Sequence, residues 1–236
     1  MTGDARREVI DANLREVQDQ IGQAASSAGR DPGEVTLVVV TKTFPTSDIR
    51  LLRELGVRHV GENRHPEAAG KAAELADLDL VWHFVGQLQS NKAARIASYA
   101  DVVHSVDSLR AARRLGVGAH SSGRVVTCLV QVSLDPPGAD AGRAGVAESE
   151  LAVLADAVEA TDGLRLGGVM GVAPPGQPAA EAFARLAELG RQIRLEHPGA
   201  TAMSAGMSGD FPQAIRAGAT HVRVGSAILG SRPPLR

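Results

Sequence analysis

The chain has 236 residues, a net charge of −2 at pH 7, 44% hydrophobic residues and 22% charged residues. This composition is typical of a soluble globular protein, and no uninterrupted apolar run approaches the roughly 20 residues needed to cross a membrane. The near-neutral charge and 3% aromatic content argue against a nucleic-acid partner, since neither a broad basic patch nor stacking platforms are indicated. The N-terminus lacks the apolar core and cleavage site of a signal peptide, so we expect a cytoplasmic protein.

The chain is expected to begin with a helix over residues 5–28. Apolar residues recur there at spacings of three and four, which places them on one helical face, and Gly29 follows as a C-cap. From residue 35 onward the pattern changes to short β-type runs, each followed by a helical pattern. Eight runs are predicted strands: 35–41, 57–61, 80–86, 101–106, 124–132, 164–172, 200–206 and 220–225.

Helical patterns lie between these runs and are clearest at 47–55, 148–160 and 179–196. Alternation of strand and helix indicates a parallel sheet covered by helices. Eight repeats favour a closed (β/α)₈ TIM barrel, in the α/β class, over the alternative of a doubly wound open sheet. No long linker divides the chain, so a single domain over 1–236 is predicted, with 133–145 as a long loop after the fifth strand.

The first predicted strand runs directly into Lys42, one of three lysines in a chain with 22 arginines. Functional groups in barrels of this kind lie at the carboxyl ends of the strands and in the loops that follow. A lysine partly desolvated at such an end is favoured in its neutral form and is nucleophilic toward aldehydes and ketones. An exposed lysine just past a strand would need no function, and the residue alone leaves both interpretations open.

The loops after the seventh and eighth predicted strands have the composition of a phosphate site. SAGMSGD (204–210) and RVGSA (223–227) supply Gly and Ser just before helical segments, and backbone N–H groups at helix N-termini favour a bound phosphate. Arg223 alternates with Val222 and Val224, so it points into the barrel mouth or to its outer wall. If it points inward, its guanidinium can hydrogen-bond to a ring nitrogen and keep that nitrogen unprotonated.

Other polar residues at strand ends each have two interpretations. His83 in VWHFVG contacts a ligand or is a buried, hydrogen-bonded residue of the strand. Glu62 and Asn63 orient the lysine or a ligand hydroxyl, or else form a turn with an N-cap. The single cysteine, Cys128, is expected to be a small buried strand residue. With one cysteine the chain forms no internal disulfide and no cysteine zinc cluster, and no metal is expected.

Several motifs together resemble a known family. TKTFP, HVGENR, WHFVGQLQSNK, GGVMGV and SAGMSGDFPQAIRAGATHVRVGSAILG occur in the order and spacing of the pyridoxal phosphate (PLP) homeostasis proteins, from about residue 5 to 232. The family is similar to the barrel domain of alanine racemase, so the resemblance implies an alanine racemase N-terminal-domain-like barrel with an extra N-terminal helix. It implies PLP bound as a covalent imine, or Schiff base, on Lys42.

The resemblance also implies roles for the rest of the pocket. Arg223 is expected to face the pyridine nitrogen, Asn63 and His83 to belong to the pocket wall, and Met207 to lie nearby. The residues expected around the phosphate are Ser204, Ser208, Gly225 and Ser226. Gly225-Ser226 replaces a common Gly-Thr and preserves the hydroxyl.

The function implied is a PLP-binding protein of intracellular PLP homeostasis without robust catalytic turnover. It is expected to be a monomer and to have apo PLP-dependent enzymes as partners. An amino-acid racemase is the alternative, but racemisation needs acid/base groups on both faces of the substrate, and the single tyrosine, Tyr99, falls in a helical region. A barrel aldolase needs a neighbouring acid/base group, and Lys71 and Lys92 are expected in helical segments away from the strand ends.

Two segments depart from the family pattern. GENRHPEA stands where many relatives continue GEN with a Tyr and a Gln-Glu, so the wall near Arg64 and His65 is expected to differ. In GRAG, Arg143 occupies the place of a usual lysine, and arginine does not form the imine that a lysine forms.

Overall fold

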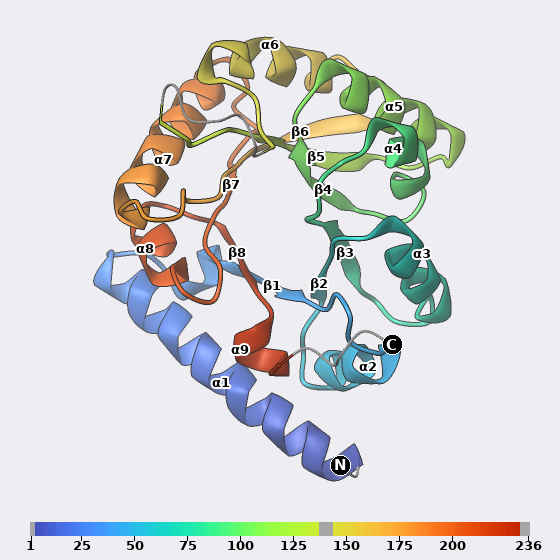
Figure 1. The fold of residues 1–236 in the computed structure, drawn as a ribbon, viewed down its shortest axis with the longest axis vertical. Coiled ribbons are helices and arrows are strands. Elements are labelled where there is room, and N and C mark those ends of the chain that lie inside the picture. Colours follow the sequence, from blue (N-terminus) through green and yellow to red (C-terminus); the bar gives the residue numbers. More distant parts are fainter. Residues whose placement is uncertain (1–2, 137–143, 232–236) are drawn as a thin grey trace.

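The computed structural model describes residues 3–136 and 144–231. Eight parallel strands form a closed barrel in chain order, with β8 paired to β1 (Figure 1). The strands are β1 Thr36–Val40, β2 His59–Glu62, β3 Val81–Phe84, β4 Val102–Val106, β5 Val126–Gln131, β6 Leu164–Met170, β7 Ala202–Ser204 and β8 His221–Val224. The (β/α)₈ barrel is therefore confirmed, and the open-sheet alternative is wrong because every strand has two neighbours.

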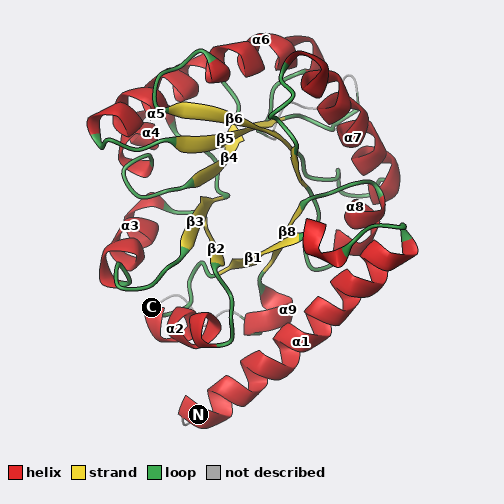
Figure 2. Ribbon diagram, turned by 180° about the vertical axis from the view of Figure 1, so that it is seen from behind, coloured by secondary structure: helices red, strands yellow, loops and turns green. Residues whose placement is uncertain are grey.

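Helices surround the barrel on its outside (Figure 2). They are α1 Gly3–Ser27, η1 Pro32–Glu34, α2 Thr46–Glu54, α3 His65–Glu74, α4 Ser90–Ile96, α5 Leu109–Ser121, α6 Glu148–Glu159, α7 Ala179–Glu196, α8 Phe211–Arg216 and α9 Ser226–Leu229. The predicted extra helix before the first strand is confirmed as α1, and Gly29 follows it with φ +68°. Within the described ranges, none of these helices combines the length and the apolarity that crossing a bilayer requires.

Helix α1 packs on the outside of the barrel, along α8 and α9 (Figure 1). Its buried face, which includes Ile10, Leu14 and Val17, packs in one cluster with residues of α8 and α9 such as Ile215 and Ile228. The same cluster contains outward-facing strand residues. Burial of this apolar stripe explains why residues 3–27 fold as a helix although they lie outside the β/α repeat.

Strand alternation decides which side chains enter the barrel. Val222 and Val224 of β8 and Val39 of β1 belong to the outer apolar cluster, as does Trp82 of β3. Because successive side chains of a strand point to opposite faces, the residues that precede and follow these outward-facing ones point into the barrel. The barrel interior is consequently polar at several levels, whereas the apolar core lies between the strands and the helices.

Most strands begin or end one to three residues from their predicted bounds, and two further details differ from the sequence prediction. The seventh strand is limited to Ala202–Ser204, since Gly206 takes a φ of +88° and turns the chain away from the sheet. Tyr99, expected in a helical region, lies in the turn after α4. Cys128 is fully buried on β5, as predicted.

Candidate cofactor-binding site

A cavity of about 590 Å³ opens at the carboxyl ends of the strands. Its size falls in the range of small-molecule and cofactor sites. Seven of the nine predicted site residues line it: Lys42, Asn63, Met207, Ser208, Arg223, Gly225 and Ser226. The fold thus brings the lysine that follows β1 and the two Gly/Ser loops that follow β7 and β8 around one space.

The loops after β7 and β8 present backbone donors to this cavity. Ser208 and Gly209 lie in a turn before α8, and Ser226 opens α9, whose first N–H groups have no intrahelical acceptor. A Cβ placed on Gly225 would lie 3.0 Å from the carbonyl oxygen of Val40, so this position accepts a glycine best. Free amides and serine hydroxyls at a close backbone approach suit an anionic group such as phosphate.

Arg223 points into the barrel mouth, which is one of the two directions predicted for it. Its side chain lines the cavity although the residue is only 6% exposed. Nη1 donates to the hydroxyl of Ser204 at 2.6 Å and Nη2 donates to the carbonyl oxygen of Gly171 at 3.3 Å. Burial lowers the pKa of Arg223 to about 10, against the attraction of Asp210, so the guanidinium still carries its charge at neutral pH.

His83 and Ser204, the other two predicted site residues, are absent from the lining of the cavity. Both side chains lie deeper in the barrel, with residue exposures of 1% and 0%. The His83 ring instead lies between those of His59 and His104, so its contact with a ligand stays a prediction. Ser204 instead supports the guanidinium from below.

The buried polar residues form a continuous hydrogen-bonded chain. His59 Nδ1 lies 2.9 Å from His83 Nε2, His83 Nδ1 lies 2.8 Å from His104 Nε2, and His104 Nδ1 lies 2.8 Å from Ser204 Oγ. Arg223 only donates, so the Ser204 hydroxyl gives its own hydrogen to His104, and each following ring donates to the next. One set of neutral tautomers satisfies the whole chain, here named the histidine chain: Arg223, Ser204, His104, His83 and His59.

Acid is expected to destabilise the protein through this histidine chain. Burial lowers the pKa of His83 and of His104 well below the usual value, so the unfolded state binds protons first as the pH falls. Below a pH of about 6.5, each of the two is expected to remove up to about 1.4 kcal/mol of unfolding free energy per pH unit. Urea unfolding between pH 7.5 and about pH 5 measures the slope.

A matched pair of variants tests the cause of this acid dependence. His83→Gln is expected to flatten the slope, whereas His120→Gln, at an exposed position on α5, is expected to leave it unchanged. A parent protein whose unfolding free energy stays constant over this pH range would contradict the expectation.

A buried ionic cluster fixes the backbone on both sides of Lys42. Lys71 of α3 donates from Nζ to the carbonyl oxygen of Thr41 at 2.9 Å, to Glu62 at 2.8 Å and to Glu67 at 2.6 Å. Thr41 Oγ1 donates to Glu62 at 2.6 Å, and the N–H of Thr43 donates to Glu67 at 2.6 Å. We call Lys71, Glu62 and Glu67 the Lys71 cluster.

The charges of the Lys71 cluster are strongly coupled. Burial raises the pKa of Glu62, while Lys71 and the Thr41 hydroxyl act in the opposite direction. Burial would also raise the pKa of Glu67, but the hydrogen bonds from Lys71 and the Thr43 amide outweigh it and lower that pKa. The lysine therefore compensates two carboxylates at the point where β1 ends.

Thr43 adopts a strained conformation next to the candidate lysine. Its φ is +70°, and it is the one non-glycine residue with positive φ among residues 3–136 and 144–231. A β-branched residue in this region costs about 1–3 kcal/mol and persists where surrounding contacts impose it. Glu67, which accepts from the Thr43 amide, is the contact that imposes it here.

The Lys71 cluster corrects one premise of the sequence analysis. Lys71 lies in a helix, as predicted, but its ammonium reaches the ends of β1 and β2, so placing it away from the strand ends was wrong. The pairing of Glu67 and Lys71 at i,i+4 on one helix was the sequence signal available for it. Lys71 does not line the cavity, so the structure adds no second amine beside Lys42.

The two departures from the family pattern have different outcomes. Arg64 and His65 lie at the start of α3, next to Asn63 of the cavity wall. Arg143 lies outside the described residues.

Asp210 precedes α8 with Pro212 in its first turn, where a proline fits a helix without loss of a hydrogen bond.

Comparison with known proteins places this barrel in a class. The sequence model of the alanine racemase N-terminal domain matches residues 10–233. A curated pyridoxal phosphate homeostasis protein of Pseudomonas aeruginosa is 42% identical, covering 94% of this chain and 96% of that protein. The chain belongs to the pyridoxal phosphate homeostasis protein family.

Solved structures agree with this placement. PipY of Synechococcus elongatus, in a structure with PLP bound, has a TM-score of 0.81 and 36% identity, covering 94% of this chain and 100% of that one. Alanine racemase from Corynebacterium glutamicum has a TM-score of 0.65 and 18% identity, covering 98% of this chain and 63% of that one. The second likeness shows a shared barrel fold.

Proposed function

We propose that this protein binds PLP in the cavity at the barrel mouth and serves intracellular PLP homeostasis without robust turnover of a substrate. The observation that carries the proposal is the convergence of Lys42, Arg223 and the two Gly/Ser loops on one cavity. The PLP-bound structure of a relative with 36% identity supports the choice of ligand.

The residues of the cavity fit the parts of this cofactor. A bound PLP would supply an aldehyde, a group that an amine holds by condensation with loss of one water. Lys42 is the amine for this bond. Ser208, Ser226 and the amides beside them hold the phosphate, and Arg223 donates to the pyridine nitrogen. Ser204 contributes by fixing Arg223, through the hydrogen bond at 2.6 Å.

The cavity offers little for acid/base catalysis. Its described lining contains no Asp, Glu, His, Cys or Tyr. Tyr99 is not part of that lining, and burial raises the pKa of its hydroxyl. Arg223, placed at the pyridine nitrogen, would keep that nitrogen unprotonated and the ring a weak electron sink. These features favour a PLP-holding protein over the racemase alternative, which needs proton donors on both faces of the substrate.

The PLP-loaded protein is expected to be spectroscopically stable and catalytically silent with amino acids. Addition of PLP should give an absorbance band at about 420 nm that saturates at one PLP per chain. Incubation with L-alanine or L-serine in deuterated water should leave the α-proton signal intact by NMR. Sustained α-proton exchange at catalytic protein concentration would overturn the non-enzyme assignment and favour the racemase.

The proposal extends to the protein as a whole. Residues 1–236 form one PLP-binding domain that acts in the cytoplasm as a monomer and delivers PLP to apo PLP-dependent enzymes. Transfer to an apo-enzyme in the presence of a PLP trap is expected to be faster than free release. Transfer no faster than free release would leave storage as the role.

A further inference from the structure

A second cavity, of about 500 Å³, lies beside the candidate PLP cavity. The two cavities share three lining residues, Asn63, Gly86 and Gln87. Phe84 and Ile96 give the second cavity an apolar part, while Gln87 and Gln89 add amide groups. We call this space the side pocket.

The side pocket is lined by cations and has no carboxylate among its described lining residues. Arg64, His65 and Lys92 line it, and Arg95 of α4 acts electrostatically on His65. Throughout the described part of the chain, Arg64, Lys92 and Arg95 form no ion pair. Glu67, which is paired with Lys71, attracts Arg64 without forming an ion pair with it. The side pocket therefore carries two fixed positive charges, from Arg64 and Lys92, without a bound counter-charge.

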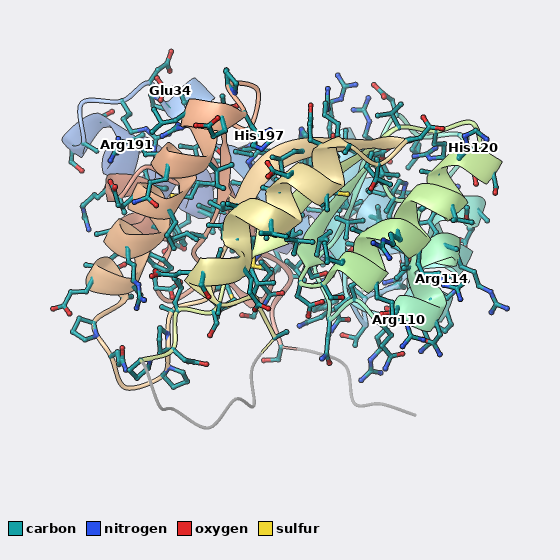
Figure 3. All side chains as sticks on the ribbon, turned by 90° about the horizontal axis from the view of Figure 1, so that it is seen from above. Glu34, Arg110, Arg114, His120, Arg191 and His197 are labelled. Atoms are coloured by element: carbon teal, nitrogen blue, oxygen red, sulfur yellow. The ribbon has the colours of Figure 1, made fainter. Side chains whose placement is uncertain are left out.

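Helix α4 contributes to the lining of the side pocket, and α5 packs against α4. Neither α4 nor α5 contains an acidic residue. Arg110 and Arg114 project outward from α5 on the side of the molecule seen at the lower right (Figure 3). Basic groups gathered on one side raise the local concentration of anions and speed their association.

His65 supplies an unused polar atom in the same place. Its Nδ1 is buried and has no hydrogen-bond partner within the described chain, while its ring stacks on Tyr99 with centroids 5.8 Å apart. Burial, Arg95 and Lys92 lower the pKa of His65, so the ring is neutral at pH 7. Cations without a counter-ion favour a bound anion, and a neutral His65 ring has one N–H that can donate to it.

We propose that the side pocket binds a phosphate group, either as free phosphate or on a small phosphate ester whose apolar part contacts Phe84 and Ile96. Two fixed cations match the charge of a phosphate dianion, and the amides of Gln87 and Gln89 supply further donors. Arg64 and Lys92 take no part in the imine chemistry of Lys42, but the two cavities share Asn63, Gly86 and Gln87, so phosphate binding is tested with PLP in place.

Calorimetric titration of the PLP-loaded protein tests the proposal, because PLP then fills the main cavity. Inorganic phosphate is expected to bind at one site per chain. Lys92→Gln and Arg64→Gln are each expected to weaken it about tenfold, the effect of losing one charge-assisted hydrogen bond. Arg216→Gln, an exposed site on α8 with the same change in charge, should have no effect.

Phenyl phosphate separates the two sources of the group. Tighter binding than inorganic phosphate supports an ester with an apolar part, and equal binding supports free phosphate. Proton NMR provides a second readout, in which phosphate should raise the pKa of the His65 ring, assigned with His65→Gln. The groups that act on this ring are Lys92, Arg95 and Tyr99, and Arg64 lines the same pocket.

Three results would overturn the proposal that the side pocket binds a phosphate group. The first is the absence of phosphate binding to the PLP-loaded protein. The second is binding that neither Lys92→Gln nor Arg64→Gln weakens. The third is binding seen only without PLP and displaced stoichiometrically by it, which would assign phosphate to the main cavity.

Discussion

Replacing Lys42 with alanine is expected to abolish the absorbance band at about 420 nm that PLP gives with the parent protein. Lys42 is the one lysine among the described residues that line the cavity. The ammonium of Lys71 lies at the ends of β1 and β2, where it donates to the carbonyl oxygen of Thr41 and to two carboxylates. Without the imine, PLP is retained by its phosphate and ring contacts alone, and ultrafiltration should remove it readily.

The matched control for this experiment is Lys92→Ala. Lys92 lies in the neighbouring side pocket, so its removal should preserve both the band and the stoichiometry of PLP. Borohydride reduction of the parent protein followed by peptide mass analysis should place the cofactor on the peptide that contains Lys42. An unchanged spectrum in Lys42→Ala would reject Lys42 as the imine-forming residue and direct attention to the other two lysines.

Local patterns predicted the architecture because barrel geometry follows from them. Runs of β-branched residues separated by helical patterns gave eight strands, and the alternation of Val222, Arg223 and Val224 limited Arg223 to two directions. Burial of both valines in the outer cluster then decided the direction. Lys42 was predicted to be a functional residue because it directly follows the first strand.

The histidine chain and the Lys71 cluster were not predictable in the same way. His83, His104 and Ser204 come from three strands, and their contacts depend on barrel closure and on the register between β3, β4 and β7. His83 therefore looked like a wall residue of the pocket. Lys71 looked remote because a long side chain carries its charge several residues away from its backbone position.

Replacing Lys71 with methionine is expected to destabilise the protein by roughly 3–5 kcal/mol, because Glu62 is left buried beside Glu67 without a counter-charge. The Lys71 side chain is 9% exposed and that of Glu62 is 1% exposed, so water cannot compensate the loss. Urea unfolding at neutral pH measures the change. Lys92→Met, on the neighbouring helix, should stay within about 0.5 kcal/mol of the parent.

The double variant Glu62→Gln/Lys71→Met distinguishes the buried charge from lost packing. It removes the charge together with its partner, so most of the stability should return. If it is as unstable as Lys71→Met alone, packing rather than charge explains the loss.

The pH dependence of Lys71→Met provides an independent check. In this variant burial still raises the pKa of Glu62, now unopposed by the lysine. The folded state then binds a proton at a pH where the unfolded state does not, so the stability deficit should shrink as the pH falls toward the unfolded value of about 4.3. The comparison is made against the parent at each pH, because the histidine chain lowers the stability of both proteins in acid.

The Lys71 cluster should also affect PLP. It holds the Thr41 carbonyl on one side of Lys42 and the strained Thr43 amide on the other, so loosening it frees the turn that aims the amine. In the double variant, where stability is largely restored, PLP release followed at about 420 nm should still be faster than in the parent. Release at the parental rate would show that β1 alone positions Lys42 and that the cluster serves only the stability of the barrel.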